Sequence, residues 1–226
     1  MTSSARRRLY LMRHAQVRYF QGENPREVQL TDIGRAQAEA AAAALIGVQF
    51  GRVITSGLPR TFETARIVVP KQLPERNAAL REIESGDIRG LEPAVVEEMM
   101  TTAFRGTVPL DTQFLGGESV GELLDRVLPQ LDALLRDEGW DVVLLVLHGA
   151  VNRAILSRAV TGQRIFLGGF EQAPGCINVL DVDAERAFVV RAVNHTPYDP
   201  AHVSAPRLTT MEQLWQEYLD SRGRNP

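Results

Sequence analysis

Apolar runs that end in basic or imidazole side chains recur along the chain. Residues 9–12 form the run Leu-Tyr-Leu-Met, which leads directly into Arg13 and His14. Residues 142–147 form a longer run of valine and leucine, which leads into His148. Short runs that are apolar at consecutive positions predict buried strands of a sheet covered on both faces. Because open α/β sheets bind ligands at the carboxyl ends of their strands, both polar ends are expected at one edge.

A third apolar run adds another basic residue to this edge. Residues 52–56 predict a strand, and a Gly-Leu-Pro turn then leads to Arg60. Taken alone, an Arg-His pair after a strand would indicate only a solvated strand end. The chain has four histidines, however, and two of them end predicted core strands, so the recurrence indicates a shared site.

Helical signals separate the strands. Thr31 is a favourable N-cap residue ahead of an alanine-rich stretch, and Ser119 ends a Gly-Gly-Glu-Ser segment that caps a longer helix. Predicted helices cover residues 31–46, 60–69, 93–104, 120–137, 149–160 and 209–221, and two more strands cover 177–182 and 187–193. This alternation predicts an α/β fold, a three-layer sandwich whose mostly parallel central sheet is flanked by helices. The polar stretch 18–30 predicts a loop that leads away from the ligand end of the first strand.

Composition places these elements in one domain. The chain has 226 residues, 44% of them hydrophobic, and no linker, charge block or repeat divides residues 1–226. A formal net charge of −3 favours neither a nucleic acid nor an anionic membrane as partner. The one cysteine, Cys176, excludes an intramolecular disulfide and suits a reducing compartment. No stretch approaches the ~20 apolar residues of a membrane span, so we expect a soluble cytoplasmic protein.

The converging residues favour phosphate chemistry. Two arginines and two histidines in a small volume form a cationic pocket, and repulsion between like charges implies an anion as its occupant. The planar guanidinium group binds two phosphate oxygens at once. A neutral imidazole is a nucleophile near neutral pH, so attack on phosphorus would give a phosphohistidine. This chemistry requires no metal or other cofactor.

A leaving alcohol needs a proton, which predicts an acid near the same edge. Glu82 and Glu84 follow the third strand and its helix. The negative charge of a bound phosphate favours the protonated form of a neighbouring carboxyl group. We expect Glu84 to be an ordinary solvated side chain and Glu82 to be the acid.

A metal site built on the two histidines is the rival interpretation. No third histidine or acidic ligand has suitable spacing, and the flanking arginines would repel a cation. The sequence therefore favours an anion site over a metal site.

The motifs that carry these residues resemble those of the histidine phosphatase superfamily, which has the phosphoglycerate-mutase-like fold. The resemblance runs from residue 9 to about 194 and implies His14 as nucleophile and Glu82 as general acid. It also implies a phosphate pocket formed by Arg13, Arg60, His14 and His148, and a lid or insertion at about 87–117. The matching segments are Arg13–His14–Ala15 and, in chain order, residues 30–38, 56–65, 80–86, 116–119 and 148–149.

The sequence departs from the family pattern beside the first motif. Ala15 replaces a glycine, which adds a methyl group next to the pocket. Val17 stands where a threonine or serine is common, and Phe20 stands where many members have an asparagine that contacts phosphate. Losing that amide is expected to weaken one side of the pocket and to offer an apolar surface instead. Gly57 replaces a frequent aspartate, a change we expect to be harmless.

Within the family, the sequence favours a metal-independent phosphomonoesterase over a phosphoglycerate-type mutase. The mutases carry a Gly-Trp-x-Asp stretch after the first motif and a longer insertion after the acid, and residues 21–25 and 91–115 lack them. A phospho-ligand binding module with little turnover is the third alternative, although a pure binder has no use for an acid. The partner would be a small phosphorylated substrate, because nothing indicates a macromolecule.

The identity of the alcohol and the oligomeric state stay open at this point. Gln16, Tyr19, Phe20 and Gly149 are candidate residues of a substrate pocket. Aromatic residues in neighbouring segments indicate either an organic group larger than glycerate or ordinary lid and core packing; they are Phe104 and Phe114. Asn194 and His202 are further candidates for the crevice, with His202 the better fit to an ordinary surface histidine. The apolar face of Leu214, Trp215 and Tyr218 suits packing on the domain or contact in a homodimer.

Overall fold

The central element of the computed structural model is a six-stranded sheet, and the structure describes residues 6–20 and 24–223. The strands lie in the order β3-β2-β5-β1-β7-β8. The three apolar runs at 9–12, 52–56 and 142–147 form strands of one sheet, as predicted, and the structure shows that they are neighbours in it. The strand bounds are β1 Arg7–Arg13, β2 Arg52–Thr55, β3 Glu75–Arg76, β5 Val142–Leu147, β7 Ile177–Val182 and β8 Phe188–His195.

Strand direction confirms a mostly parallel sheet with one strand reversed. β3, β2, β5 and β1 pair in parallel, whereas β7 runs antiparallel to both β1 and β8. The reversal follows from the connection after α5, because Ile177 at the start of β7 pairs with Met12 near the end of β1. The chain has therefore already returned to the carboxyl edge of the parallel strands when β7 begins.

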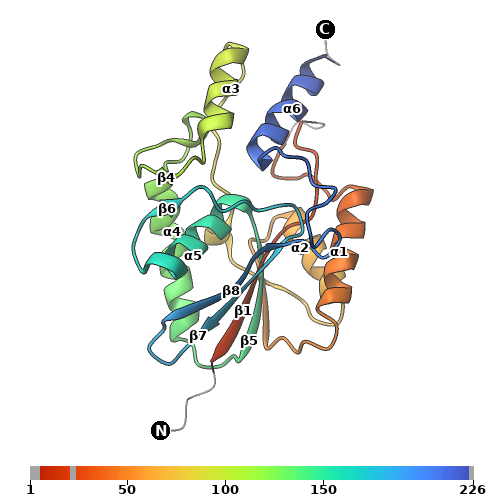
Figure 1. The fold of residues 1–226 in the computed structure, drawn as a ribbon, viewed down its shortest axis with the longest axis vertical. Helices are drawn as coiled ribbons and strands as arrows, with labels where there is room; N and C mark the ends of the chain where they lie inside the picture. Colours follow the sequence, from red (N-terminus) through yellow and green to blue (C-terminus); the bar gives the residue numbers. More distant parts are fainter. Residues whose placement is uncertain (1–5, 21–23, 224–226) are drawn as a thin grey trace.

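Helices cover both faces of the sheet, which gives the predicted three layers (Figure 1). The Thr31 side chain caps α1 by accepting the Gly34 N–H at 3.0 Å, and Ser119 and Glu122 form a capping box at the start of α4. The predicted helices are thus confirmed to within a few residues at each end. Their bounds are α1 Asp32–Ala44, α2 Pro59–Val68, α3 Pro93–Thr102, α4 Val120–Arg136, α5 Gly149–Thr161 and α6 Thr210–Gly223.

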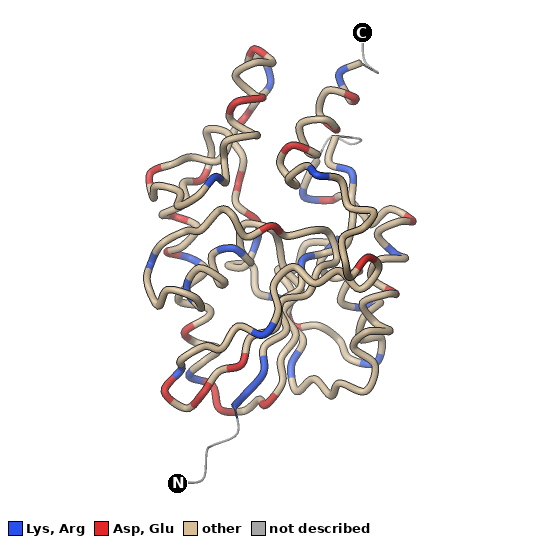
Figure 2. The backbone as a smooth tube through the Cα atoms, in the orientation of Figure 1, with Lys and Arg blue, Asp and Glu red and all other residues tan. Residues whose placement is uncertain are grey.

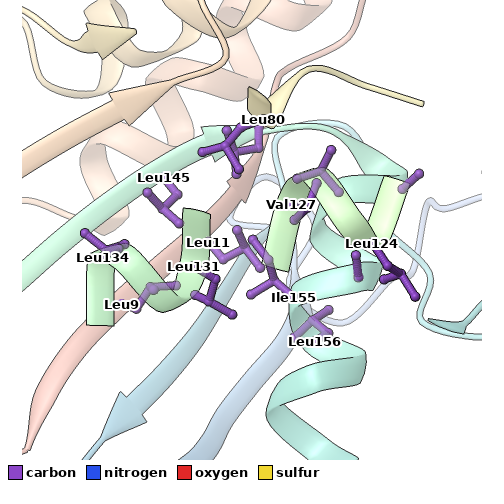
Figure 3. Packing of buried hydrophobic residues seen from close by; sticks show 14 of the residues in the cluster. Leu9, Leu11, Leu80, Leu124, Val127, Leu131, Leu134, Leu145, Ile155 and Leu156 are labelled. Carbon is purple, nitrogen blue, oxygen red and sulfur yellow. The ribbon is translucent and has the colours of Figure 1, made fainter. Parts of the chain in front are cut away.

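The core lies on both faces of the sheet because side chains alternate along each strand. Leu9 and Leu11 of β1 point to one face, where they pack with Leu145 of β5 and with buried residues of α4 and α5 (Figure 3). Met12 and the alternate residues of β5 point to the other face and pack against α1 and α2. The apolar face of α4 is buried on the side of Leu9 and Leu11, through Leu123, Val127, Leu131 and Leu134.

A smaller layer stands beyond the carboxyl ends of the parallel strands. α3 and α6 project from the domain on this side, away from the N-terminus (Figure 1). Val96 and Met100 of α3 and the 3₁₀ turn Phe114–Gly116 pack with Trp215 and Tyr218 of α6 in a separate apolar cluster. The apolar face of α6 therefore packs on its own domain. A short ladder of β4 (Thr107–Val108) with β6 (Phe166–Leu167) borders this layer.

Charged residues of both signs are interspersed along the whole chain. Figure 2 shows Lys and Arg next to Asp and Glu on the body of the domain and on the projecting helices, without segregation of either sign. Among the described residues, no helix has the length and apolar content that crossing a membrane requires.

Candidate active site

His14 lies one residue past the end of β1 and is 1% exposed. Its main-chain N–H donates to the Leu147 carbonyl at 2.9 Å, which continues the pairing with β5. Its ring Nδ1 lies 2.8 Å from the Ala15 carbonyl oxygen, which can only accept a hydrogen bond. Nδ1 therefore carries the proton, and Nε2 presents its lone pair to the cleft.

Tyr19 contacts that lone pair directly. Its hydroxyl lies 3.2 Å from His14 Nε2 and donates to it, given the tautomer. The Tyr19 main-chain N–H donates to Glu217 of α6 at 2.7 Å, and the Arg60 guanidinium lies 5.5 Å from the centre of the tyrosine ring. The C-terminal helix thus holds the residue that covers the imidazole nitrogen.

His148 forms the other side of the pocket as the N-cap residue of α5. Its ring centre lies 5.3 Å from that of His14, and its Nε2 lies 2.8 Å from the Ser56 hydroxyl oxygen. Burial, followed by the positive charge of Arg60, holds the pKa of His148 well below its usual range. The same two causes lower the pKa of His14, with Arg13 adding to them, so both rings are neutral near pH 7.

Two buried arginines complete the polar wall of the pocket. Arg13 donates from Nη1 to the Gln172 carbonyl at 2.6 Å, and Arg60, in the first turn of α2, donates from Nη1 to the Pro25 carbonyl at 3.3 Å. Within the described part of the chain, the buried side-chain nitrogens without a hydrogen-bond partner are Arg13 Nε, Arg60 Nε, His148 Nδ1 and Arg81 Nε. The unpaired arginine donors each cost about 1–3 kcal/mol, so they favour binding of an anion.

Glu82 and Glu84 lie in different surroundings. A carboxylate oxygen of Glu82 accepts the Ala150 N–H at the start of α5 at 3.1 Å. A Cβ atom built on Gly149 would lie 3.6 Å from Glu82 Oε2 and 3.8 Å from Arg13 Nε, which places the carboxylate beside the basic pocket. Glu84 instead forms ion pairs with Arg26 and Arg81 at the rim, at 2.8 and 3.4 Å. The structure therefore places Glu82 beside Arg13 of the basic pocket, whereas Glu84 pairs with arginines at the rim.

Arg153 is a third buried arginine that the sequence analysis did not single out. It is 4% exposed, donates from Nε to the Gly168 carbonyl at 3.1 Å, and lies 3.7 Å from a carboxylate oxygen of Glu171. Its guanidinium group also lies 5.1 Å from the centre of the Phe104 ring. The available signal was a charged residue on a helix that is otherwise buried. Ser56 lies in the predicted motif segment 56–65, but its contact with His148 was not predicted.

A cleft of about 820 Å³ opens beside the pocket and contains most of the predicted substrate residues. Gln16, Tyr19, Phe20 and Gly149 all line it. The Gln16 side chain also accepts the Thr31 hydroxyl at 2.7 Å, which ties the loop after β1 to the start of α1.

Four expectations about the surroundings of the site are decided by the structure. The loop 18–30 does not lead away, because Tyr19, Phe20 and residues 24–26 line the cleft; residues 21–23 lie outside the described residues. Asn194 turns from the cleft and accepts the Ala173 N–H at 2.7 Å. His202 is exposed, as expected of a surface histidine. Cys176 is buried, as a small core thiol should be.

The rival metal site finds no cluster of ligands in residues 6–20 and 24–223. No group of three histidine, cysteine or acidic side chains gathers there in a way that could hold a metal ion. Instead, the positive charges of Arg60 and Arg13 both act to lower the pKa of His14 and of His148.

Fold and site together define a phosphoglycerate-mutase-like α/β protein with a basic, histidine-containing pocket at the carboxyl edge of its sheet. The chain belongs to the histidine phosphatase superfamily, branch 1, whose family model matches residues 9–196. The resemblance in the motifs is thus confirmed over most of the chain.

Individual relatives include proteins named as phosphatases and as mutase-like. The chain is 31% identical over 185 residues to the glucosyl-3-phosphoglycerate phosphatase of Mycolicibacterium vanbaalenii, covering 74% of this chain and 81% of the relative. It is 32% identical over 142 residues to phosphoglycerate mutase-like protein 4 of Arabidopsis thaliana, covering 59% of this chain and 61% of that protein. A mycobacterial glucosyl-3-phosphoglycerate phosphatase structure in complex with inorganic phosphate aligns with TM-score 0.67 at 26% identity, over 84% of this chain and 98% of the other.

Proposed function

We propose that this protein is a phosphomonoester hydrolase that works through a phosphohistidine on His14. The observation that carries the proposal is the surrounding of His14 Nε2. This unprotonated nitrogen faces the cleft, which Arg13 and Arg60 with their unpartnered Nε donors also line, and the His148 ring lies beside it. A tetrahedral phosphate would satisfy these donors and would place its phosphorus within reach of the imidazole. Relatives that are named as phosphatases also support the proposal.

The reaction would proceed in two displacements. In the first, the lone pair of His14 Nε2 forms a bond to phosphorus while the bond to the ester oxygen breaks, and Glu82 donates its proton to the departing alcohol. In the second, Glu82 takes a proton from water, whose oxygen bonds to phosphorus as the P–N bond breaks. Inorganic phosphate leaves, and both side chains regain their starting states. The arginines stabilise the charge on the phosphoryl oxygens in both steps.

Tyr19 would change partners during this cycle. Its hydroxyl lies where phosphorus must approach Nε2, so it leaves the imidazole when the substrate binds. The displaced hydroxyl can then donate to a phosphoryl oxygen. This hydrogen bond would replace the phosphate contact that the family's asparagine makes and that Phe20 cannot make.

The substrate would be a small phosphorylated compound, and no metal or other cofactor would take part. The two arginines repel a cation at the position where phosphorus is expected. The segment 87–117, which contains α3 and contributes Ile88, Phe104 and Phe114 to the cleft, is proposed as the lid of a single domain.

Hydrolysis of p-nitrophenyl phosphate by the full chain tests the proposal. We expect release of nitrophenol that is undiminished by EDTA, and acid-labile phosphate on the protein after a rapid quench. Incubation with 3-phosphoglycerate separates the alternatives, since free phosphate indicates a phosphatase and 2-phosphoglycerate indicates a mutase. Binding of phosphate without turnover of any ester would leave a binding module, and loss of activity on chelation would restore the metal interpretation.

A further inference from the structure

We propose that the cleft between α3 and α6 binds a bulky apolar alcohol, so that the preferred substrate is a monophosphate ester of an alkyl or aryl alcohol of about six carbons or more. This inference rests on the proposed function and specifies its substrate class. The cleft is continuous with the phosphate pocket, because Arg13, His14, Arg60 and Glu82 line the same space. Whatever alcohol leaves from phosphorus therefore occupies it.

Part of the cleft wall beyond Glu82 is apolar, although polar side chains such as Arg153, Gln213 and Glu217 line the same space. Phe20 packs edge-to-face on Tyr218 of α6, with ring centres 5.4 Å apart, and Phe104 stacks on Phe114 at 5.6 Å. Ile88 and Leu214 also line the space and are only partly buried, so they keep surface that a ligand can cover. An alcohol gains about 0.8 kcal/mol for each methylene that it buries against such a wall.

The arginines at the rim are paired with carboxylates, but two of them share one carboxylate. Arg26 and Arg81 both reach Glu84, and Arg89 pairs with Asp87 at 2.8 Å. A second phosphate or a carboxylate on the substrate would have to compete with these carboxylates for the arginines. The preference for an apolar alcohol therefore comes from the aromatic walls of the cleft and not from the charge of its rim.

The size of the cleft fits a bulky group. A volume of about 820 Å³ lies within the range of roughly 300–1,000 Å³ typical of sites for drug-sized ligands. A phosphorylated three-carbon acid would fill the polar end and leave the aromatic walls in contact with water. With a bulky alcohol bound, Phe20 and the apolar residues of α6 that line the cleft would both contact the substrate.

A series of straight-chain alkyl phosphates, from propyl to octyl, tests this inference. The acidity of the leaving alcohol is nearly constant along the series, so chemistry at phosphorus does not change. We expect kcat/KM to rise about fourfold per methylene until the cleft is full, with octyl phosphate at least about 100-fold above propyl phosphate. A flat series, or a decline with chain length, would overturn the inference while leaving a phosphatase in place.

Matched variants of α6 locate the effect in the cleft. Leu214→Gln places an amide in the apolar wall, and we expect the octyl-to-propyl ratio of kcat/KM to fall about tenfold or more. Leu219→Gln makes the same change on the same helix at a residue that is 44% exposed and outside the cleft, and its ratio should equal that of the wild type. Equal ratios in both variants would place the chain-length effect elsewhere and overturn the assignment.

Failure of the proposed function can be told apart from failure of this inference. If no ester is hydrolysed, the proposed function is wrong, and alkylphosphonates of increasing length can then be titrated against the wild-type protein by calorimetry. Affinity that rises with chain length supports the apolar site without any turnover. Affinity that is independent of chain length overturns it.

Discussion

The inner phosphate pocket and the outer cleft differ in how they are built. The pocket takes its side chains from the ends of β1 and β5 and from the first turn of α2, and those side chains are almost fully buried. The outer cleft is lined by segments outside the sheet, chiefly the loop after β1, the end of α3 with Phe104, and α6, and many of these side chains are only partly buried. Under the proposed function, the sheet would fix the chemistry, whereas the projecting helices would set the choice of alcohol. Changes to the pocket should affect all substrates, and changes to the cleft should discriminate between them.

Removal of the proposed nucleophile should have the largest effect. His14→Ala is expected to lower kcat by about 10⁴-fold or more for every phosphate ester, because no other group replaces the attacking nitrogen. Stopped and continuous assays with alkyl and nitrophenyl phosphates measure it. His195→Ala, an exposed histidine at the end of β8, serves as the control and should stay active. An active His14→Ala protein would remove the nucleophile assignment.

Loss of the proposed acid should separate substrates by their leaving group. Glu82→Gln is expected to slow an alkyl phosphate by about 10²–10⁴-fold, but to affect p-nitrophenyl phosphate far less, because nitrophenol leaves with little help from a proton. The ratio of the two rates is the measurement. Glu84→Gln should leave that ratio as in the wild type. Equal slowing of both esters by Glu82→Gln would assign the acid elsewhere.

Tyr19→Phe should have a smaller effect that is the same for all alcohols. A hydrogen bond to a charged group contributes about 1.5–3 kcal/mol, so we expect kcat/KM to fall about 10- to 100-fold on propyl and octyl phosphates alike. Unchanged kcat/KM would show that the hydroxyl contributes nothing to the transition state. A change in the octyl-to-propyl ratio would instead place Tyr19 in the outer cleft.

The buried histidines should make stability depend on pH in a defined direction. Burial lowers the pKa values of His14 and His148 in the folded protein. In the unfolded chain each imidazole has its ordinary pKa of 6.5, so below pH 6.5 the unfolded chain binds protons that the folded protein does not. The free energy of unfolding should therefore fall as pH decreases below 6.5, by up to about 1.4 kcal/mol per pH unit for each ring. Urea unfolding at pH 7, 6 and 5.5 measures this slope. His14→Ala should reduce it, and an identical slope in the variant would contradict the expected linkage.

Local patterns in the sequence were sufficient for the elements that carry the pocket. The consecutive apolar residues of β1 and β5, the Thr31 cap of α1 and the Ser119 cap of α4 act over a few residues, so the sequence shows them directly. The same patterns place Arg13, His14, Arg60 and His148 after strands that meet at one edge. For this reason the fold class and the convergence of these residues could be predicted without coordinates.

Contacts between distant segments could be decided only by the tertiary structure. The direction of β7 depends on the path that the chain takes back to the sheet edge after α5, which no local pattern records. Glu82, unlike Glu84, contacts the N-terminus of α5, and only the tertiary structure shows this contact. The Tyr19 hydroxyl reaches His14 because Glu217 of α6 holds the Tyr19 main chain. From the sequence, the apolar residues of α3 and α6 fit a buried core as well as the wall of a binding site. Only the tertiary structure shows that some of them line a cleft. The physical reason is that a sequence specifies short-range preferences and burial, whereas a site depends on the relative position of elements far apart in the chain.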